Sequence, residues 1–300
     1  MKAAMFHVKR PASRGLAGVR QGASTGQARA SAMLARAATG LACVLIAACS
    51  SPEETAAGTG SAPSHTTAEA AAPPPAASAF SDNANQGEAS REFAYSWPAE
   101  AAAIPALAAQ LTAERDRLLA EQKAEWAEAL AEFAGEDCVA CTNRAFEKSW
   151  EVVANLPRYL SLSASFYAYT GGAHGNGAFD ALVWDREAGA GLDPKAMFRS
   201  QAALQDALGA AWCKALKAEK IKRFEGEEVD DSFFPCPPIA DLTVLLGSSD
   251  RKAFNRIGLI AAPYVAGSYA EGAYEVTLPV TAKVIDAVRP EYRDAFALPK

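Results

Sequence analysis

The stretch Tyr159–Tyr169, YLSLSASFYAY, alternates strictly between two kinds of side chain. The apolar set is Leu160, Leu162, Ala164, Phe166 and Ala168. The hydroxyl-bearing set is Tyr159, Ser161, Ser163, Ser165, Tyr167 and Tyr169. A period of two over this length predicts a β-strand with two distinct faces. The apolar face is expected to be core, and the hydroxyl face is either a binding surface or a solvated one.

The chain is expected to reverse its direction immediately after this strand and to form a second, antiparallel strand. Residues Tyr169–Gly177, YTGGAHGNG, contain four glycines, which permit positive φ angles and close approach of the backbone. Ala178 to Arg186 then places Phe179, Ala181 and Val183 on one side. The two segments therefore predict a β-hairpin.

The glycine-rich turn is the main candidate for a ligand site. Its candidate binding residues are Tyr169, Gly171, Gly172, His174 and Asn176. Backbone amides and the imidazole of His174 could contact a ligand there. The alternative is a purely structural turn in which the histidine bonds the backbone, and turns of this composition are usually structural.

Two longer segments show helical spacing. The first runs from Ala101 to Phe133, with Pro105 in its first turn and Gly135 after its end. The second runs from Gln201 to about Arg223. Shorter segments predict strands at Phe93–Trp97, Asp241–Leu246, Arg256–Ala262 and Ala273–Val280, and a helix near Lys283–Val288. The elements do not alternate regularly, so we expect an α+β fold with a largely antiparallel sheet, two main helices and two lobes.

The N-terminal region is typical of a bacterial lipoprotein. An apolar run from Leu41 ends in Ala47-Ala48-Cys49-Ser50 and is far shorter than the ~20 residues of a membrane-spanning helix. We expect residues 1–48 to be a signal peptide, starting at Met1 or Met33, and Cys49 to carry the lipid, including a fatty acid such as palmitate. Ser50 in place of an aspartate favours the outer membrane, with the protein facing the periplasm.

Residues 49–90 are rich in Ala, Pro, Ser and Thr, and predict a disordered tether. The seven basic residues of 1–48 leave with the signal peptide. The mature chain then has 22 of the 29 basic residues against all 35 acidic ones, a net charge near −13. This excess argues against nucleic acid as a partner and suits a basic protein, although solubility alone would also explain it.

Four cysteines remain in the segment expected to fold: Cys138, Cys141, Cys213 and Cys236. In an oxidising compartment they predict two disulfides, for which three connectivities exist. A local bridge within the C-x-x-C of Cys138 and Cys141 is favoured, which pairs Cys213 with Cys236. A redox motif or a zinc site with all four thiolates is a weaker alternative.

Motifs for cofactor or metal chemistry are missing from the sequence. There is no phosphate-binding loop and no G-x-S-x-G, and the S-x-x-K match at Ser249–Lys252 lacks its partner motifs. His174 and Asp180 do not make a metal set by themselves. We therefore expect no cofactor and no metal, and a protein that is not an enzyme is favoured.

The turn Tyr169–Asn176, the strand before it and Phe179-Asp180 after it resemble a known family. This is the extracytoplasmic domain pair of the RsiV-type anti-sigma factors, which sense lysozyme; the pair also occurs beside the catalytic domain of PdaC-type peptidoglycan deacetylases. Pro263-Tyr264-Val265-Ala266-Gly267 is similar to the family's second motif and adds Tyr264 to the ligand-binding candidates.

The resemblance implies a PdaC-like α+β lobe at 91–170, an RsiV-like α+β lobe at 171–300, and a binding or sensing role. The ligand implied is lysozyme or a peptidoglycan component. A transmembrane helix and a sigma-binding segment are replaced here by the lipid anchor, and no deacetylase domain is present. The alternative is an enzyme that modifies peptidoglycan or polysaccharide, with His174 as general base and Asp180 as its acidic partner.

Overall fold

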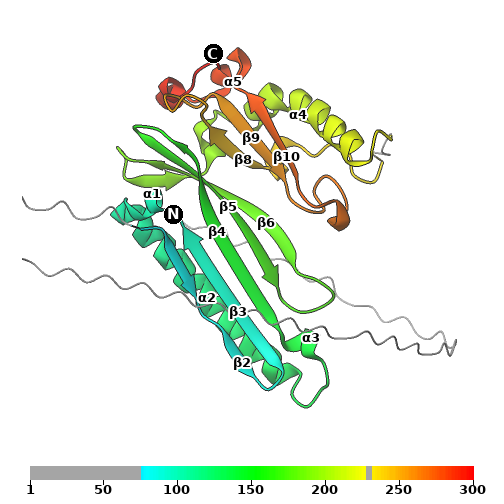
Figure 1. Ribbon diagram of the computed structural model, residues 1–300. Coiled ribbons are helices and arrows are strands. Elements are labelled where there is room, and N and C mark those ends of the chain that lie inside the picture. Colours follow the sequence, from blue (N-terminus) through cyan, green and yellow to red (C-terminus); the bar gives the residue numbers. More distant parts are fainter. Residues whose placement is uncertain (1–75, 228–231) are drawn as a thin grey trace, which may run out of the picture. The chain divides into compact units, whose positions relative to one another are not determined.

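The computed structural model describes residues 76–227 and 232–300, which belong to one compact unit. The expected signal peptide, Cys49 and most of the expected tether lie outside these residues. Within the described ranges, no helix is both long and apolar enough to cross a bilayer. The strands of these ranges form one seven-stranded and one three-stranded sheet. Figure 1 shows the two sheets with their helices, and the α+β class with two main helices is confirmed.

The large sheet contains β1 (Ser78–Ser81), β2 (Ala84–Gln86), β3 (Ala89–Trp97), β4 (Arg144–Asn155), β5 (Tyr159–Tyr169), β6 (Asn176–Asp185) and β7 (Ala190–Leu192). Its order is β1-β3-β4-β5-β6-β7, with β2 also paired to β3. The β3–β4 pair is parallel, and the other neighbours are antiparallel. The small sheet, β10-β9-β8, is antiparallel and contains β8 (Thr243–Gly247), β9 (Arg256–Ala261) and β10 (Tyr274–Pro279).

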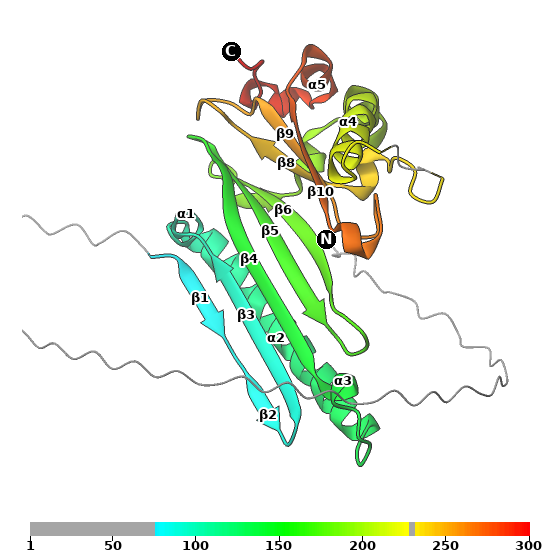
Figure 2. The ribbon, with the colours of Figure 1, turned by 45° about the vertical axis from the view of Figure 1, so that its right-hand side comes forward.

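Helix α2 (Pro105–Glu132) connects β3 to β4 and lies along one face of the large sheet (Figures 1 and 2). Pro105 occupies its first turn, and Gly135 follows its end with a φ of 85°. Leu107 and Leu111 are fully buried against aromatic side chains of β3 and β4. The short helices α1 (Ala99–Ala102) and α3 (Val139–Thr142) stand before and after α2.

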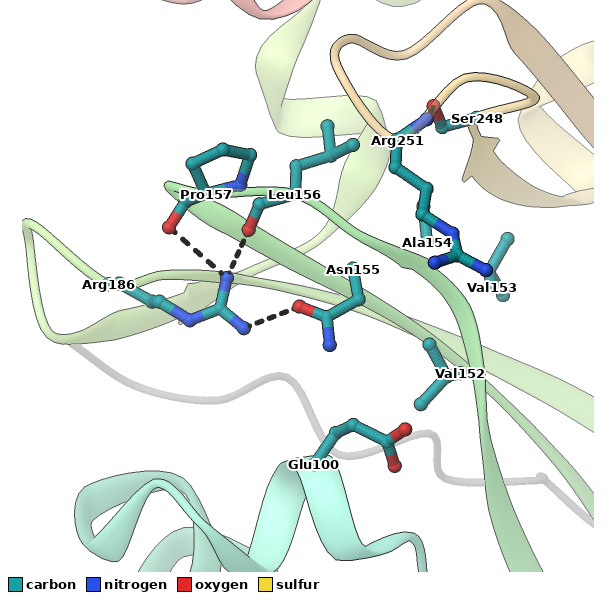
Figure 3. Close-up of a pocket in the computed structure, with 10 residues that line it drawn as sticks. All are labelled: Glu100, Val152, Val153, Ala154, Asn155, Leu156, Pro157, Arg186, Ser248 and Arg251. Atoms are coloured by element: carbon teal, nitrogen blue, oxygen red, sulfur yellow. Dashed lines mark hydrogen bonds between the residues drawn. The ribbon is translucent and has the colours of Figure 1, made fainter.

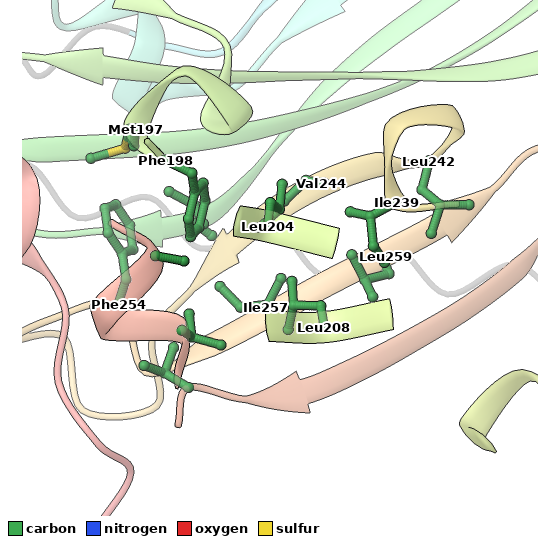
Figure 4. Close-up of a cluster of buried hydrophobic side chains, with 14 of the residues drawn as sticks. Met197, Phe198, Leu204, Leu208, Ile239, Leu242, Val244, Phe254, Ile257 and Leu259 are labelled. Carbon is green, nitrogen blue, oxygen red and sulfur yellow. The ribbon is translucent and has the colours of Figure 1, made fainter. Parts of the chain in front are cut away.

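Helix α4 (Gln201–Arg223) packs against the small sheet and, with α5 (Ala282–Ala287), builds a second core (Figure 4). Leu204, Leu208 and Trp212 bury the stripe that the helical spacing predicts. Short 3-10 turns complete the chain at Pro194–Met197, Ile239–Asp241, Tyr269–Glu271 and Pro290–Ala295. Ser200 caps α4 by accepting the amide hydrogen of Ala203.

Strand β5 shows the two faces that its alternation predicts, but both are buried at its first end. Leu160 and Leu162 belong to the core under α2, whereas Tyr159 belongs to the second core, where its ring lies 5.8 Å from that of Phe254. Ser161, on the same face as Tyr159, is also fully buried. The face expected to be a binding surface or solvated is therefore open only toward the Tyr169 end.

Two expected boundaries are wrong. The tether was placed as far as residue 90, yet β1 begins at Ser78, because Phe80 packs on Phe93 at the edge of the sheet. The lobes were divided at residue 170, yet β5 and β6 pair from Tyr159↔Asp185 to Ala168↔Asn176 and share one sheet. The second core also takes Ala154 of β4, Tyr159 of β5 and Val183 of β6.

The cysteines join as the sequence predicts. Cys213 on α4 is bonded to Cys236, with a Cα–Cα distance of 5.6 Å, and Cys138 to Cys141, with 5.3 Å. The first bridge ties α4 to the loop before β8, across a sequence separation of 23 residues. In the loop-entropy view, closing a loop of this size contributes about 3 kcal/mol to stability.

A buried lysine lies in the middle of the large sheet, beneath α2. Lys148 on β4 has a side chain only 4% exposed, and its ammonium contacts Glu114 of α2 and Asp180 of β6, each at 2.5 Å. Glu114 also accepts the hydroxyl hydrogen of Tyr95 at 3.0 Å, and Tyr95 in turn accepts from the indole of Trp150. Burial, with the Glu114 charge, raises the pKa of Tyr95. Each buried polar group of this network thus has a partner.

Removing the lysine should destabilise the fold strongly. Lys148→Ala is expected to lower the free energy of unfolding by about 2–3 kcal/mol, because Glu114, whose side chain is 24% exposed, loses its cation and the half-exposed Asp180 loses its partner. Urea unfolding followed by circular dichroism measures this. The control is Lys123→Ala, which breaks a more exposed pair with Asp82 and should cost less than about 1 kcal/mol. Equal losses in the two variants would contradict this role for Lys148.

Candidate binding site at the tip of the β5–β6 hairpin

The hairpin tip is fixed by glycines for steric reasons. A Cβ on Gly175 would lie 2.4 Å from the ring of Tyr167 and 2.7 Å from the carbonyl oxygen of Ala168, so only glycine fits. Gly171 has a φ of 99°, and its Cβ would lie 3.2 Å from the carbonyl oxygen of Ala140. These two positions force the turn and set the direction of His174.

His174 belongs to an aromatic cluster that joins two distant parts of the sequence. Its ring stacks on Tyr269, with centroids 4.0 Å apart and an angle of 22°. Its Nδ1 lies 2.8 Å from the carbonyl oxygen of Gly175, which can only accept, so Nδ1 carries a hydrogen. Its Nε2 lies 3.4 Å from the hydroxyl of Tyr264. The histidine is thereby held between the hairpin and the loop after β9.

Tyr264 is held in an unusual backbone conformation. Its φ is 71°, in the left-handed region that bulky residues rarely adopt, and its side chain is exposed. The ring lies 5.6 Å from that of Tyr269. Strain of this kind is found most often at functional sites, where the rest of the structure enforces it. An exposed, strained tyrosine beside a histidine therefore points to a contact site.

A polar clamp fixes the loop that carries these tyrosines. Glu271 accepts hydrogen bonds from the amide of Ser268 at 2.6 Å and from the hydroxyl of Tyr274 at 2.5 Å. Arg223, at the end of α4, donates to the carbonyl oxygens of Glu271 and Ala273, and its guanidinium lies 3.9 Å from the ring centre of Tyr274. The clamp connects the second core to the aromatic cluster.

The clamp also shifts two ionisation equilibria. Burial alone would raise the pKa of Glu271, but the hydrogen bonds from Tyr274 and Ser268 outweigh it and hold that pKa below 4.5. Burial, together with the neighbouring Glu271 charge, raises the pKa of Tyr274 to about 12. Glu271 is therefore ionised at neutral pH and Tyr274 is protonated, as their hydrogen bond requires.

A groove of about 350 Å³ lies beside the cluster, on the sheet face that α2 does not cover. It is lined by Glu147, Ser149, Ser165, Phe166, Tyr167, Gly177, Ala178, Phe179, Pro263 and Ala273. One wall comes from β4, β5 and β6, and the other from the loop between β9 and β10. Hydroxyls, one carboxylate and aromatic faces are groups that bind sugars or polar protein surfaces.

The expected ligand residues divide into two sets. His174 and Tyr264 come together, although 90 residues separate them. Tyr169 and Gly172 instead hold the short helix α3: the Tyr169 hydroxyl lies 3.1 Å from the carbonyl oxygen of Ala140, which also accepts the Gly172 amide. Gly171 also meets this segment, and Asn176 is exposed at the start of β6. The structure thus gives Tyr169, Gly171 and Gly172 contacts that support the turn.

The proposed catalytic pair of His174 and Asp180 does not form. Asp180 lies on the face beneath α2 and is bound to Lys148, whereas His174 contacts Tyr264, Tyr269 and a carbonyl oxygen. In the parts of the chain that the structure describes, no three His, Cys, Asp or Glu side chains are grouped as metal ligands would be. The register of β6 explains the separation, because Asp180 is paired with Ala164 of the core face.

Two site residues were not anticipated. Tyr269 lies five positions after Tyr264 in a loop without periodicity, so only its aromatic character could have drawn attention. Glu147 lies on β4, a strand that the sequence analysis did not identify. The alternation of Phe146, Lys148, Trp150 and Val152 was a usable signal for it, although a buried lysine interrupts the apolar set.

Comparisons with known proteins support part of the family resemblance. Residues 84–177 match the sequence model of a family described as Deacetylase PdaC. This segment runs from β2 to the start of β6 and includes the glycine-rich turn. The match is consistent with the expected PdaC-associated domain over this segment, and the RsiV type stays a prediction. No curated protein matches the chain.

Two solved structures are similar to the fold. One is a DUF3298 family protein from Pseudomonas aeruginosa PAO1, with 18% identity, a TM-score of 0.46, and coverage of 75% of this chain and 97% of that one. The other is a DUF3298 family member from Bacteroides fragilis NCTC 9343, with 17% identity, a TM-score of 0.39, and coverage of 69% and 91%.

The clamp predicts a dependence of stability on pH. The folded pKa of Glu271 is lower than its unfolded value, so its contribution is complete above about pH 4.5 and disappears as pH falls through the folded pKa. Glu271→Gln is expected to lower the free energy of unfolding by about 1 kcal/mol at pH 7. Urea unfolding of both proteins from pH 7 to pH 3 should show their difference shrinking below pH 4.5. A difference that stays constant across this range would contradict the assignment.

Proposed function

We propose that this chain is a non-catalytic binding module of the cell envelope, of the RsiV extracytoplasmic type, and that a lipid on Cys49 anchors it. Its ligand is a basic wall-acting protein of the lysozyme kind, with a peptidoglycan component as the second candidate. The observation that carries this proposal is the meeting of His174 with Tyr264 and Tyr269 beside an open groove.

The chemistry of the open sheet face supports a basic protein. Glu92, Glu147 and Glu151 are exposed on β3 and β4, and the register places all three on the face opposite α2. The mature chain is acidic as a whole. Exposed carboxylates speed the encounter with a cationic partner, while exposed aromatic rings supply the contact area that sustains binding.

The enzymatic alternative has less support. The enzymatic reading pairs His174, as general base, with the carboxylate of Asp180, which would have to lie within hydrogen-bond reach of the imidazole. His174 instead contacts a carbonyl oxygen and two tyrosines, and Asp180 belongs to the lysine network on the other face. A binding role requires no such pair.

Removing the tyrosine ring should weaken binding without weakening the fold. Tyr264→Gly takes away the aromatic contact and relieves the positive φ, so we expect at least tenfold weaker binding to lysozyme and no loss of thermal stability. Isothermal titration calorimetry with hen lysozyme and with soluble wall fragments measures the affinity, and calorimetric unfolding measures the stability. His174→Ala should weaken binding in the same direction.

The contribution of the groove carboxylate to binding is tested with a matched pair of variants. Glu147→Gln, in the groove, should weaken lysozyme binding and reduce its salt dependence, whereas Glu128→Gln on the exposed side of α2 should leave both unchanged. A parallel screen for hydrolase and deacetylase activity tests the alternative that the protein is an enzyme. Wild-type affinity in Tyr264→Gly, or turnover that His174→Ala abolishes, would overturn the proposal.

The anchor is tested separately in cells. The lipoprotein pattern at Ala47-Ala48-Cys49 predicts that the native protein is found in the membrane fraction, with the outer membrane in a double-membraned cell. Cys49→Ala should leave an unprocessed precursor of higher mass, because the cysteine sulfur is the acceptor of the lipid. Mass spectrometry of the mature N-terminus is the direct measurement. A mature protein without acyl chains in the soluble periplasmic fraction would contradict the anchor.

A further inference from the structure

A second cavity, of about 730 Å³, lies at the other end of β5 from His174 (Figure 3). It is formed where the β4–β5 turn meets the loop between β8 and β9. Strand β5 runs from Tyr159 beside this turn to Tyr169 at the hairpin tip, roughly 33 Å at the usual rise per residue. The cavity is therefore separate from the aromatic cluster, and nothing in the proposed function uses it.

One side of this cavity presents an arginine in a fixed loop. Arg251 has a φ of 59°, again in the left-handed region, and its amide donates to the hydroxyl of Ser248 at 2.9 Å. Asp250 stabilises the turn by accepting hydrogen bonds from the Ser248 hydroxyl and the Lys252 amide. In Figure 3 the guanidinium of Arg251 extends into the cavity toward Val153. Within residues 76–227 and 232–300, no carboxylate pairs with it.

A second guanidinium stands at the rim with its charge uncompensated. Arg186 donates to the carbonyl oxygen of Leu156 at 2.5 Å and to the side-chain oxygen of Asn155 at 2.8 Å. These neutral partners position the group, but no ion pair with Arg186 exists in the described part of the chain. Two cations thus face one space, and unpaired guanidinium groups in a concave site favour an anionic ligand.

The remaining lining limits what kind of anion fits. Val152, Val153 and Leu156 provide an apolar surface, while Glu100 of α1 directs its carboxylate toward the cavity from the wall opposite Arg251 (Figure 3). Glu100 also has no ion pair among the described residues. A bare inorganic anion would leave the apolar surface and Glu100 unused. A ligand with a carboxylate, a small apolar body and an ammonium group uses all three.

We propose that this cavity binds a short peptide in its zwitterionic form. The planar guanidinium of Arg251 matches the two oxygens of a free C-terminal carboxylate, which it can bind through two parallel hydrogen bonds. Glu100 receives the N-terminal ammonium, and Val152 and Val153 contact the side chains. This binding site is independent of the aromatic cluster, so either one can fail without the other.

The test uses alanyl-alanine as the probe and calorimetry on the folded chain. We expect the dipeptide to bind, its C-terminal amide to bind at least tenfold more weakly, and its N-acetyl form to lose affinity as well. Arg251→Gln should weaken binding of the dipeptide at least tenfold. Arg251→Gly should do the same without lowering the melting temperature, because glycine accepts the positive φ. Glu100→Gln should weaken the dipeptide but not its N-acetyl form.

The control is Arg199→Gln, which removes another exposed guanidinium that has no side-chain partner in the described residues and lines neither cavity. It should bind the dipeptide as the wild type does. Inorganic phosphate binding as tightly as the dipeptide, equal binding of dipeptide and amide, or wild-type affinity in Arg251→Gln would each overturn the proposal. Tyr264→Gly should leave dipeptide binding unchanged, which separates this site from the proposed function.

Discussion

Strand β5 connects two hydrophobic cores, because at its Tyr159 end each of its faces is buried against a different layer. Leu160 and Leu162 pack under α2 with the aromatic residues of β3 and β4. Tyr159 packs with Phe254 in the core of the small sheet. The hydroxyl face emerges from this cover only toward the hairpin tip. The position of the open groove therefore follows from where the second core stops covering the sheet.

Much of the fold could be predicted from local pattern alone. The bounds of α4 agree with the helical spacing, and the alternation of β5 and the disulfide from α4 to Cys236 are as expected. Strand β4 was missed because the buried Lys148 breaks its apolar alternation, and its partners Glu114 and Asp180 become neighbours only after folding. Strand β1 was missed because a short edge strand of Ser, Ala and Phe has the composition of a tether. Both strands are stabilised by contacts with residues distant in sequence, which a local pattern cannot show.

The candidate site was predictable only where a motif marked it. His174 and Tyr264 come from two motifs that the family resemblance singled out, and they do meet. Their neighbour Tyr269 and the groove residue Glu147 depend on tertiary placement, because the aromatic character of Tyr269 and the alternation of β4 say nothing of where the two residues lie relative to His174. Asp180 shows the opposite error, because proximity in sequence suggested a pair with His174 that strand register prevents. Residues close in sequence can therefore lie on opposite faces of a sheet, as His174 and Asp180 do.

Backbone strain marks both proposed sites. Tyr264 and Arg251 adopt positive φ angles although neither is a glycine, and each stands in a loop fixed by a carboxylate, Glu271 in one case and Asp250 in the other. Such conformations cost of order 1–3 kcal/mol each and persist only where neighbouring interactions enforce them. The fold thus holds the exposed ring of Tyr264 beside the tip of the β5–β6 hairpin and the guanidinium of Arg251 beside the opposite end of β5.

The central claim is that the aromatic cluster and its groove are the surface that meets the partner. Backbone chemical-shift mapping of the labelled chain during titration with lysozyme tests it most directly. We expect the largest changes at His174, Tyr264, Tyr269 and the groove residues Tyr167 and Glu147, with α2 unaffected. Changes confined to α2 or to the small sheet, or no change at all with lysozyme and with soluble wall fragments, would contradict the account.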